Sequence, residues 1–249
     1  MSKMKHPLRV LSIDFDYFQK VSVEGLFCYP DGVDVPTSLS TSIWVSHYAQ
    51  PKTREELEKV KIDKKELAYL RKILVRNSKT WKPVMIVQSH KHIYDFVMEH
   101  FAEDDYDGVQ LVNVDMHADY SNDNKTSVDC GNWVSFLEKS VPKLELTWVA
   151  NEISADAYKV SAELKKKMTP SLEGLLDDQF DIIFICRSDQ WLPPHLDKYF
   201  DKLFNLCLEL FGRIMVDNQI TEPRDYEDAV KQMEEVYANM REQFKNLKV

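Results

Sequence analysis

The sequence predicts an α/β fold in a single domain over residues 1–249, built on a mainly parallel sheet. Short apolar runs alternate with segments of helical periodicity, which is the pattern of parallel strands joined by helical crossovers. The length of 249 residues corresponds to one large or two small domains at roughly 150 residues per domain. No linker rich in glycine or serine divides the chain, so we expect one domain.

The expected strands are short apolar runs bounded by polar or turn residues. These runs are 8–15, 83–88, 109–115, 144–150 and 180–186. Helices are expected over 91–101, 131–139, 155–167 and 195–211, and in a strongly helical tail over 223–246. Capping boxes indicate two further helix starts, at Thr53 with Glu56 and at Asp63 with Glu66.

Three other segments have patterns of their own. Residues 20–50 contain several glycines and prolines among aromatic and β-branched residues, so we expect loop with a strand near 41–47. Residues 118–130 are a polar loop. In the helical tail, apolar residues recur at three- to four-residue spacing, which is typical of a core face or a contact in a homo-oligomer. These residues are Met233, Tyr237, Met240 and Phe244.

Composition excludes several classes of function. The chain has 32 Lys and Arg against 41 Asp and Glu, a net charge of −9, so its surface repels nucleic acid. No apolar run of about 18 residues and no signal sequence is present, so we expect a cytoplasmic protein without a membrane partner. The four cysteines are widely spaced, which fits a reducing compartment and disfavours a thiolate zinc site.

Candidate metal ligands follow two of the predicted strands. Asp115, His117 and Asp119 alternate after the run 109–115, and alternating residues of extended chain face the same way. Carboxylates with imidazole are ligands for Mn²⁺, Fe²⁺ or Zn²⁺. The competing interpretation is a polar strand end that caps the next helix.

Asp14 and Asp16 repeat this pattern after the run 8–15. His90 lies where another strand gives way to a helix and is the preferred sixth ligand, with His92 as the alternative. Six ligands with four carboxylates suit a pair of divalent ions, and the oxygen-rich set favours two Mn²⁺ per chain.

These motifs resemble those of the ureohydrolases, the arginase and agmatinase family. Asp115-Met-His117-Ala-Asp119 resembles the D-x-H-x-D motif of the family, and Ser12-Ile-Asp14-Phe-Asp16 resembles its S-x-D-x-D motif. Ser89-His90 is similar to the isolated histidine ligand of the family. The stretch from Cys130 to Leu137 is similar to its Ser-Gly-Asn segment, which leads into a helix. The S-x-D-x-D motif comes last in arginases but first here. The chain therefore resembles a rearranged member with a three-layer arginase-like fold, most like the small proteins that include peptide arginases.

The resemblance implies a role for each ligand. Asp115 and Asp14 would bridge two Mn²⁺ ions, His90 and Asp119 would complete one ion, and His117 and Asp16 the other. A hydroxide bridging the ions, held by Asp119, would attack the guanidino carbon of arginine. Glu152, just after the run 144–150, is a candidate to hold the guanidinium, or else a solvated residue that caps the next helix.

Two departures from the family bear on substrate and proton transfer. Ser121 stands where enzymes of free arginine have a substrate-binding Asn, which fits an arginine whose carboxylate lies in a peptide bond. Val134 stands in place of a proton-shuttle His, so His92 or His47 remains as a candidate shuttle. The expected reaction converts arginine residues of a precursor peptide to ornithine and urea, as in modified-peptide biosynthesis.

Other functions use the same residues. The alternatives are an agmatinase or other small-guanidine hydrolase, a metal-dependent amide deacetylase, and a non-catalytic binding protein on this fold. A haloacid-dehalogenase-type phosphatase would use Asp14 and Asp16 and leave the second motif without a role. Arg187 and Asp189 either line the site or form a salt bridge at a strand end, and Cys130 is either a reactive thiol or a replacement for serine.

Overall fold

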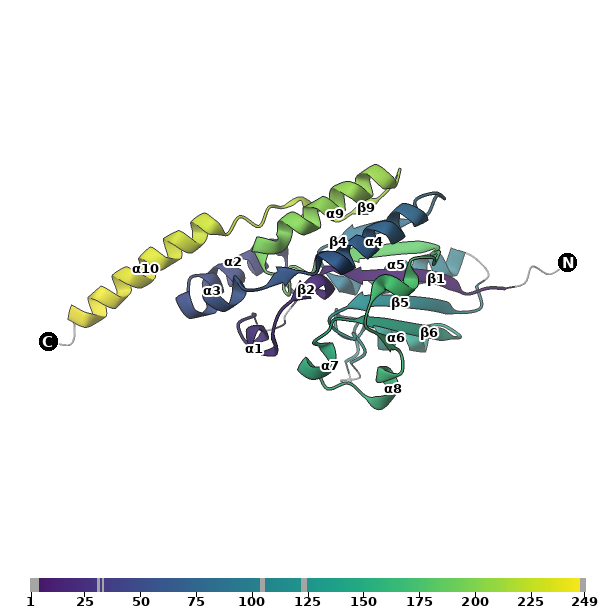
Figure 1. Ribbon diagram of the computed structural model, residues 1–249, viewed down its shortest axis with the longest axis horizontal. Helices are drawn as coiled ribbons and strands as arrows, with labels where there is room; N and C mark the ends of the chain where they lie inside the picture. The colour runs from purple at the N-terminus through teal and green to yellow at the C-terminus, as the bar shows by residue number, and fades with distance from the viewer. Residues whose placement is uncertain (1–4, 31, 33, 104–105, 122–124, 247–249) are drawn as a thin grey trace.

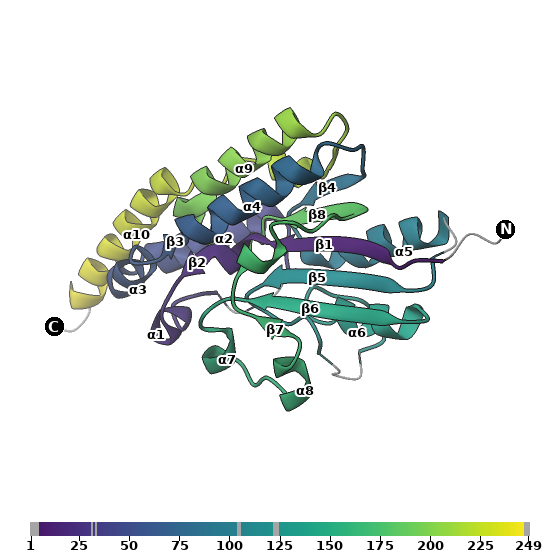
Figure 2. The same cartoon turned by 45° about the vertical axis from the view of Figure 1, so that its right-hand side comes forward.

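The computed structural model describes residues 5–30, 32, 34–103, 106–121 and 125–246. Within these residues, seven parallel strands form one sheet (Figure 2). In spatial order they are β7 (Met168–Thr169), β6 (Leu144–Ala150), β5 (Val109–Asp115), β1 (Leu8–Asp14), β8 (Ile182–Cys186), β4 (Val84–Val87) and β9 (Met215–Val216). Strands β2 (Gln19–Lys20) and β3 (Lys61–Ile62) form a small antiparallel pair. The five strands expected from sequence are confirmed.

Helices cover both faces of this sheet (Figure 1). One core packs α4 (Lys64–Asn77) and α9 (Asp197–Leu210) against Leu11, Ile13 and their neighbours, and the other packs α5 (Ile93–Glu103) and α6 (Trp133–Ser140) against Leu8 and Val10. The remaining helices are α1 (Val23–Leu26), α2 (Thr37–Tyr48), α3 (Pro51–Leu57), α7 (Ser154–Ala157), α8 (Ala162–Lys165) and α10 (Glu227–Asn246). Single turns of 3-10 helix lie at Phe15–Phe18, His90–His92, Leu172–Leu175, Pro194–Leu196 and Asn218–Thr221.

The winding of the chain reverses between β1 and β5. The connection after β1 runs through α4 on one face of the sheet, whereas the connection after β5 runs through α6 on the other face. The two strands are nonetheless adjacent and parallel, with Ile13 opposite Val114. In open α/β sheets such a switch point leaves a crevice at the carboxyl ends of the strands, where ligands bind.

The segment 20–50 corrects an expectation from sequence. Where loop with a strand near 41–47 was expected, Thr37–Tyr48 form helix α2. Its inner face is half polar, because Thr37 and Ser40 are buried together with Trp44 and donate hydrogen bonds to Asp189. A buried face of this composition shows no apolar periodicity, and tertiary contacts override the strand propensity of its residues.

Two other helix predictions differ in detail. Helix α3 begins at Pro51 rather than at Thr53, since proline fits the first turn and no side chain caps the start. The helix expected over 155–167 is two short helices, α7 and α8, because Tyr158 adopts extended backbone and ends α7. The Asp63 cap is confirmed, with the carboxylate accepting from the amides of Lys65 and Glu66.

The tail helix α10 packs by its first turns only. Val230 is buried, Met233 is partly buried beside α2, and Met240 is 47% exposed. The side chain of Phe244 and residues 122–124 of the polar loop lie outside the described part of the chain. Among the described helices, none combines the length and apolar character needed to cross a membrane.

Candidate metal centre

The carboxyl ends of β1 and β5 bring two acidic motifs together at the switch point. Asp14 ends β1, Asp115 ends β5, and the two strands pair in parallel register up to Ile13 and Val114. Asp16 and His117 follow two residues later on each chain. Asp14 and His117 line a cavity at this edge of the sheet, and Asp16 and Asp115 are fully buried next to them.

A first group of ligands surrounds His90, which follows β4. The Nδ1 atom of His90 lies 3.3 Å from Asp14 Oδ2, 3.2 Å from Asp115 Oδ2 and 3.0 Å from Asp119 Oδ2. The imidazole is 3% exposed and stacks on Phe184 with an interplanar angle of 17°. Three carboxylates therefore converge on one ring nitrogen in a dry environment.

A second group surrounds His117 and overlaps the first. The Nδ1 atom of His117 lies 3.0 Å from Asp16 Oδ2 and 3.6 Å from Asp115 Oδ1. Asp115 thus turns one carboxylate oxygen toward His90 and the other toward His117. The triads Asp14–His90–Asp115 and Asp16–Asp115–His117 share this residue, and each can hold a metal ion.

The second ring nitrogen of each imidazole, Nε2, has a hydrogen-bond partner. His90 Nε2 lies 2.7 Å from Ser12 Oγ, and His117 Nε2 lies 3.0 Å from the Tyr158 hydroxyl. An imidazole whose Nε2–H donates to such an oxygen presents the Nδ1 lone pair to the carboxylates. Partners of this kind fix the ring and its tautomer in metal sites.

Two carboxylates of the cluster have further donors. The Trp133 indole N–H donates to Asp119 Oδ2 at 2.6 Å, and the Ser188 hydroxyl donates to Asp14 Oδ2 at 3.0 Å. Asp14 Oδ1 accepts the amide of Asp16 at 3.2 Å. The Asp16 amide and the Ser188 hydroxyl therefore orient the carboxylate of Asp14.

Burial of so many like charges shifts the pKa values in opposite directions. Burial raises the pKa of Asp14 and of Asp16, and a neighbouring carboxylate adds to each rise. Burial and the charge of Asp115 raise the pKa of Asp119 to about 7. Burial would also raise the pKa of Asp115, but its contacts with the imidazoles outweigh burial and lower it.

The same contacts keep the histidines charged in the protein without metal. Burial opposes the imidazolium form of His90 and His117, but the surrounding carboxylates outweigh it and raise the pKa of both rings well above the usual value. Four carboxylates face two imidazoles here, so once all four carboxylates are ionised, positive charge is short by two even with both rings protonated. The cluster consequently favours added cations.

The geometry of the donor atoms fits divalent cations. Among the described side chains, His90 Nδ1 and Asp16 Oδ2 are buried yet lack a hydrogen bond of good geometry. An ion with ligands at about 2.0–2.2 Å places neighbouring ligands about 3 Å apart, which is the spacing around both Nδ1 atoms. Nitrogen and carboxylate oxygen without thiolate are suited to Mn²⁺, Fe²⁺ or Zn²⁺.

Strained backbone occurs at two residues that contact the cluster. Among the described residues other than glycine, Asp119 (φ 49°) and Ser188 (φ 63°) have left-handed backbone. Such conformations cost about 1–3 kcal/mol and are kept where the surrounding structure requires them. Both residues contact the cluster, Asp119 through its carboxylate at His90 and Ser188 through its hydroxyl at Asp14.

A cavity of about 310 Å³ opens onto the cluster. Asp14, His117 and Asp119 lie in its wall. Ser121 and Cys130 lie there too. Burial and nearby carboxylates raise the pKa of the Cys130 thiol, so it is not activated as a nucleophile.

Three predicted residues are not brought to the cavity. Glu152 is exposed, and its charge acts on Lys20 rather than on the cluster. His47, in α2, donates from Nδ1 to the carbonyl of Cys28, 3.0 Å away, and is not among the residues that line the cavity. His92 shares the single turn with His90 but is not among the residues that line the cavity.

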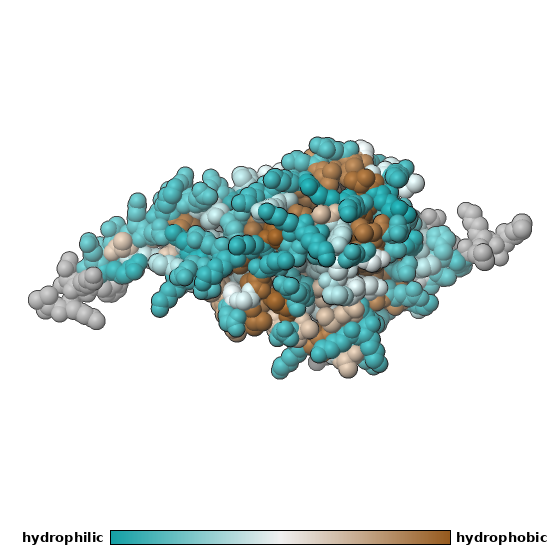
Figure 3. All heavy atoms as spheres, in the orientation of Figure 1, coloured by the Kyte–Doolittle hydropathy of each residue, from teal (hydrophilic) through white to brown (hydrophobic). Residues whose placement is uncertain are grey.

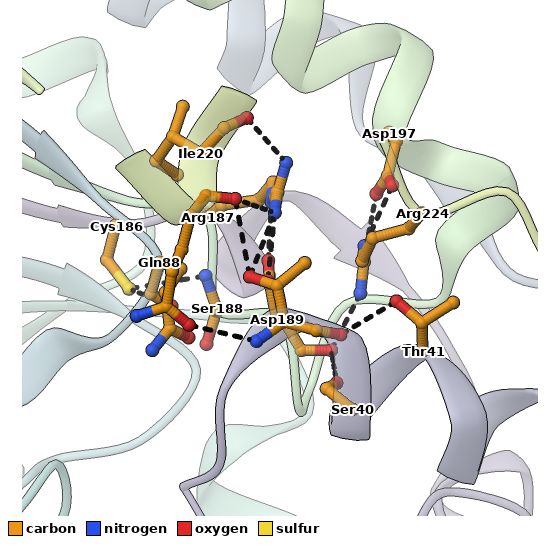
Figure 4. Close-up of polar contacts among 12 residues, drawn as sticks. Ser40, Thr41, Gln88, Cys186, Arg187, Ser188, Asp189, Asp197, Ile220 and Arg224 are labelled. Carbon is orange, nitrogen blue, oxygen red and sulfur yellow. Dashed lines mark hydrogen bonds and ion pairs between the residues drawn. The ribbon is translucent and has the colours of Figure 1, made fainter. Parts of the chain in front are cut away.

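Arg187 and Asp189 form a buried ion pair rather than a wall of the cavity (Figure 4). Arg187 also donates to the carbonyl of Ile220 at 3.0 Å, and Arg224 donates to the carbonyl of Asp189 at 2.7 Å. The network holds the loop after β8, and with it Ser188 against Asp14. The salt-bridge interpretation of the strand end is therefore confirmed.

Sequence reasoning missed the partners that position the ligands. The position of Ser12 could have been predicted, because Ser12, Asp14 and Asp16 alternate on one face. Tyr158, Trp133 and Ser188 come from separate segments with no motif, and only tertiary packing brings them to the cluster.

Comparisons with known proteins found no relative of this chain. No known protein family, curated protein or solved structure matches the chain. What can be said of its chemistry therefore depends on the geometry of the cluster and its cavity.

Proposed function

We propose that the protein is a metal-dependent hydrolase that converts an arginine residue of a peptide to ornithine and urea. The observation that carries the proposal is the pair of buried triads that share Asp115 at the switch point of the sheet. Two divalent ions held there, Mn²⁺ by preference, would lower the pKa of bound water and polarise the group under attack. The arginase-like interpretation of the three-layer fold is part of this proposal.

The reaction needs proton transfers that residues of this chain can provide. Water adds its oxygen to the guanidino carbon, the bond from that carbon to the side-chain nitrogen breaks, and this nitrogen leaves as an amine after gaining a proton. The carboxylate of Asp119 lies in the cavity wall, so it would hold the attacking water and pass on its proton. The Tyr158 hydroxyl faces the same cavity and is a candidate donor to the leaving amine, in place of His92.

Aromatic faces provide a site for the cationic substrate. Because Glu152 lies outside the cavity, the guanidinium has the carboxylates of the cluster and the rings of Tyr158 and Trp191 as partners. Both rings border His117, with centroids 4.9 and 5.9 Å from the imidazole. Guanidinium groups bind such faces favourably when water is excluded.

The experiment offers one arginine-containing peptide, free arginine and agmatine to the Mn²⁺-loaded protein, and measures urea. We expect urea from the peptide, none from the Asp115→Asn variant, and unchanged activity from Glu152→Gln, which removes an exposed carboxylate near the site. Urea from free arginine or agmatine alone would assign a small-guanidine hydrolase instead. Release of acetate from an acetyl-lysine peptide, without urea from any substrate, would assign an amide deacetylase.

A phosphatase that uses Asp14 as nucleophile has less support. It gives no role to Asp115, His117 and Asp119, although these side chains lie against Asp14, Asp16 and His90 in the same cluster.

A further inference from the structure

A second cavity adjoins the one over the metal ligands. It measures about 280 Å³ and lies between α1 with the loop that follows it and the loops that carry His117 and Tyr158. Its described lining includes Phe27, Tyr29 and Trp191, and apart from His117 it consists of apolar or aromatic residues. Small-molecule sites are typically about 300–1,000 Å³, so this cavity has the size for one side chain rather than a whole ligand.

The two cavities share part of their wall. His117, Tyr158 and Trp191 line both of them. Gly32, in the loop after α1, lies against the Trp191 ring, since an added Cβ at Gly32 would be 3.2 Å from it. A group bound in the apolar cavity is therefore a neighbour of whatever reacts over the cluster, separated from it by single aromatic side chains.

The rim of the apolar cavity carries an aromatic side chain with no cover in the protein alone. Phe27 is 85% exposed, next to the end of α1. Hydrophobic residues gather on the surface over α1 (Figure 3). Exposing a phenyl group to water is unfavourable, so a ligand that covers Phe27 gains hydrophobic free energy.

We propose that this cavity binds an apolar side chain of the residue that neighbours the arginine in the peptide. The inference rests on the proposed function, because the occupant is the same peptide. The described lining residues include no aspartate or glutamate, so a basic neighbour would be buried without an acidic partner. Free arginine has no neighbour to place here, so an occupied cavity would favour a peptide over the amino acid.

The test compares three pentapeptides with a central arginine. In the first, all other residues are glycine. In the second and third, phenylalanine replaces the glycine directly before or directly after the arginine. The Mn²⁺-loaded protein should turn over one phenylalanine peptide with kcat/KM about tenfold above that of the glycine peptide. In Phe27→Ala this ratio should fall toward one, mainly through KM. Trp81→Ala removes another exposed aromatic side chain, 76% exposed beside the amino end of β4, and should leave the ratio unchanged.

A binding measurement separates this inference from the proposed function. The same three peptides with lysine in place of arginine keep the positive charge but carry no guanidino group. By calorimetry, one phenylalanine peptide should bind the metal-loaded protein about tenfold more tightly than the glycine peptide, and Phe27→Ala should remove the difference. If no arginine peptide yields urea but this binding difference is present, the proposed reaction fails and the apolar site stands. The inference is overturned if the rate of urea release does not depend on the neighbouring residue. It is also overturned if the affinity of the lysine peptides does not depend on that residue.

Discussion

Replacing Asp115 with asparagine tests whether one residue serves both triads. Asparagine keeps the size of the side chain and an oxygen to accept the amide of His117, which lies 2.7 Å from Asp115 Oδ1. It removes the negative charge that faces both His90 and His117. We therefore expect a folded protein in which neither triad binds a divalent ion tightly.

The expected magnitude follows from ligand linkage. An ion present at 100 times its dissociation constant raises the free energy of unfolding by about 2.7 kcal/mol. For a chain of this size each kcal/mol shifts the melting temperature by about 2–4 °C, so each ion should raise it by about 5–10 °C. The wild-type protein should show this rise between EDTA and Mn²⁺ in a thermal melt, and Asp115→Asn should show almost none.

Two results would refute this reasoning. One is a wild-type melting temperature that does not respond to Mn²⁺, Fe²⁺ or Zn²⁺. The other is an Asp115→Asn variant that gains as much as the wild type, since its ligands would then lie elsewhere. Circular dichroism of the variant in EDTA checks that its fold is retained.

Three further predictions concern the partners of the cluster, its pH response and the loop after β8. Tyr158→Phe removes the hydroxyl 3.0 Å from His117 Nε2 and should weaken Mn²⁺ binding about 10- to 100-fold by titration calorimetry. Asp119, with a folded pKa of about 7 against about 3.9 unfolded, holds a proton that the unfolded chain releases, so stability of the metal-free protein should fall as pH rises from about 4 to about 7. Ions compete for that proton, so Mn²⁺ affinity should rise over the same range. Arg187→Ala removes the guanidinium that pairs with the buried carboxylate of Asp189 and should lower the free energy of unfolding by about 3–5 kcal/mol in urea denaturation.

Each of these has a control and a contrary outcome. Tyr120→Phe removes an exposed hydroxyl and should leave metal affinity unchanged, and equal affinity in Tyr158→Phe would remove that tyrosine from the site. Metal affinity that falls with rising pH would contradict the assigned protonation. Lys59→Ala breaks an exposed ion pair and should cost less than about 1 kcal/mol, and a similarly small loss in Arg187→Ala would show that its pair does not hold the loop.

The strands and the candidate ligands were predictable because they depend on local alternation. Apolar runs such as Leu8–Asp14 are buried on both faces of a parallel sheet, so they stand out from their neighbours. Asp14 and Asp115 then follow from strand ends, and adjacent carboxyl ends bring them together. Knowledge of two strands was enough to predict the cluster.

Features that depend on distant segments were not predictable. The inner face of α2 hides Thr37 and Ser40, whose hydrogen bonds to Asp189 exist only once β8 is in place. Glu152 follows β6 as expected, but its neighbour Asn151 is the residue that turns inward, to the carbonyls of Tyr17 and Gln19. Beyond the last paired residues of a strand, such contacts decide which side chains turn inward. A single sequence does not reveal them.

The most direct test of the central claim is to count and locate the ions. A crystal of the Mn²⁺-loaded protein, measured on both sides of the manganese absorption edge, should show two anomalous peaks. One peak should lie between His90 and Asp115 and the other between His117 and Asp16, with Asp115 contacting both. Two bound ions at these positions would establish the shared cluster as a dinuclear centre. No peak at either triad, in a protein that is folded and saturated with Mn²⁺, would contradict it.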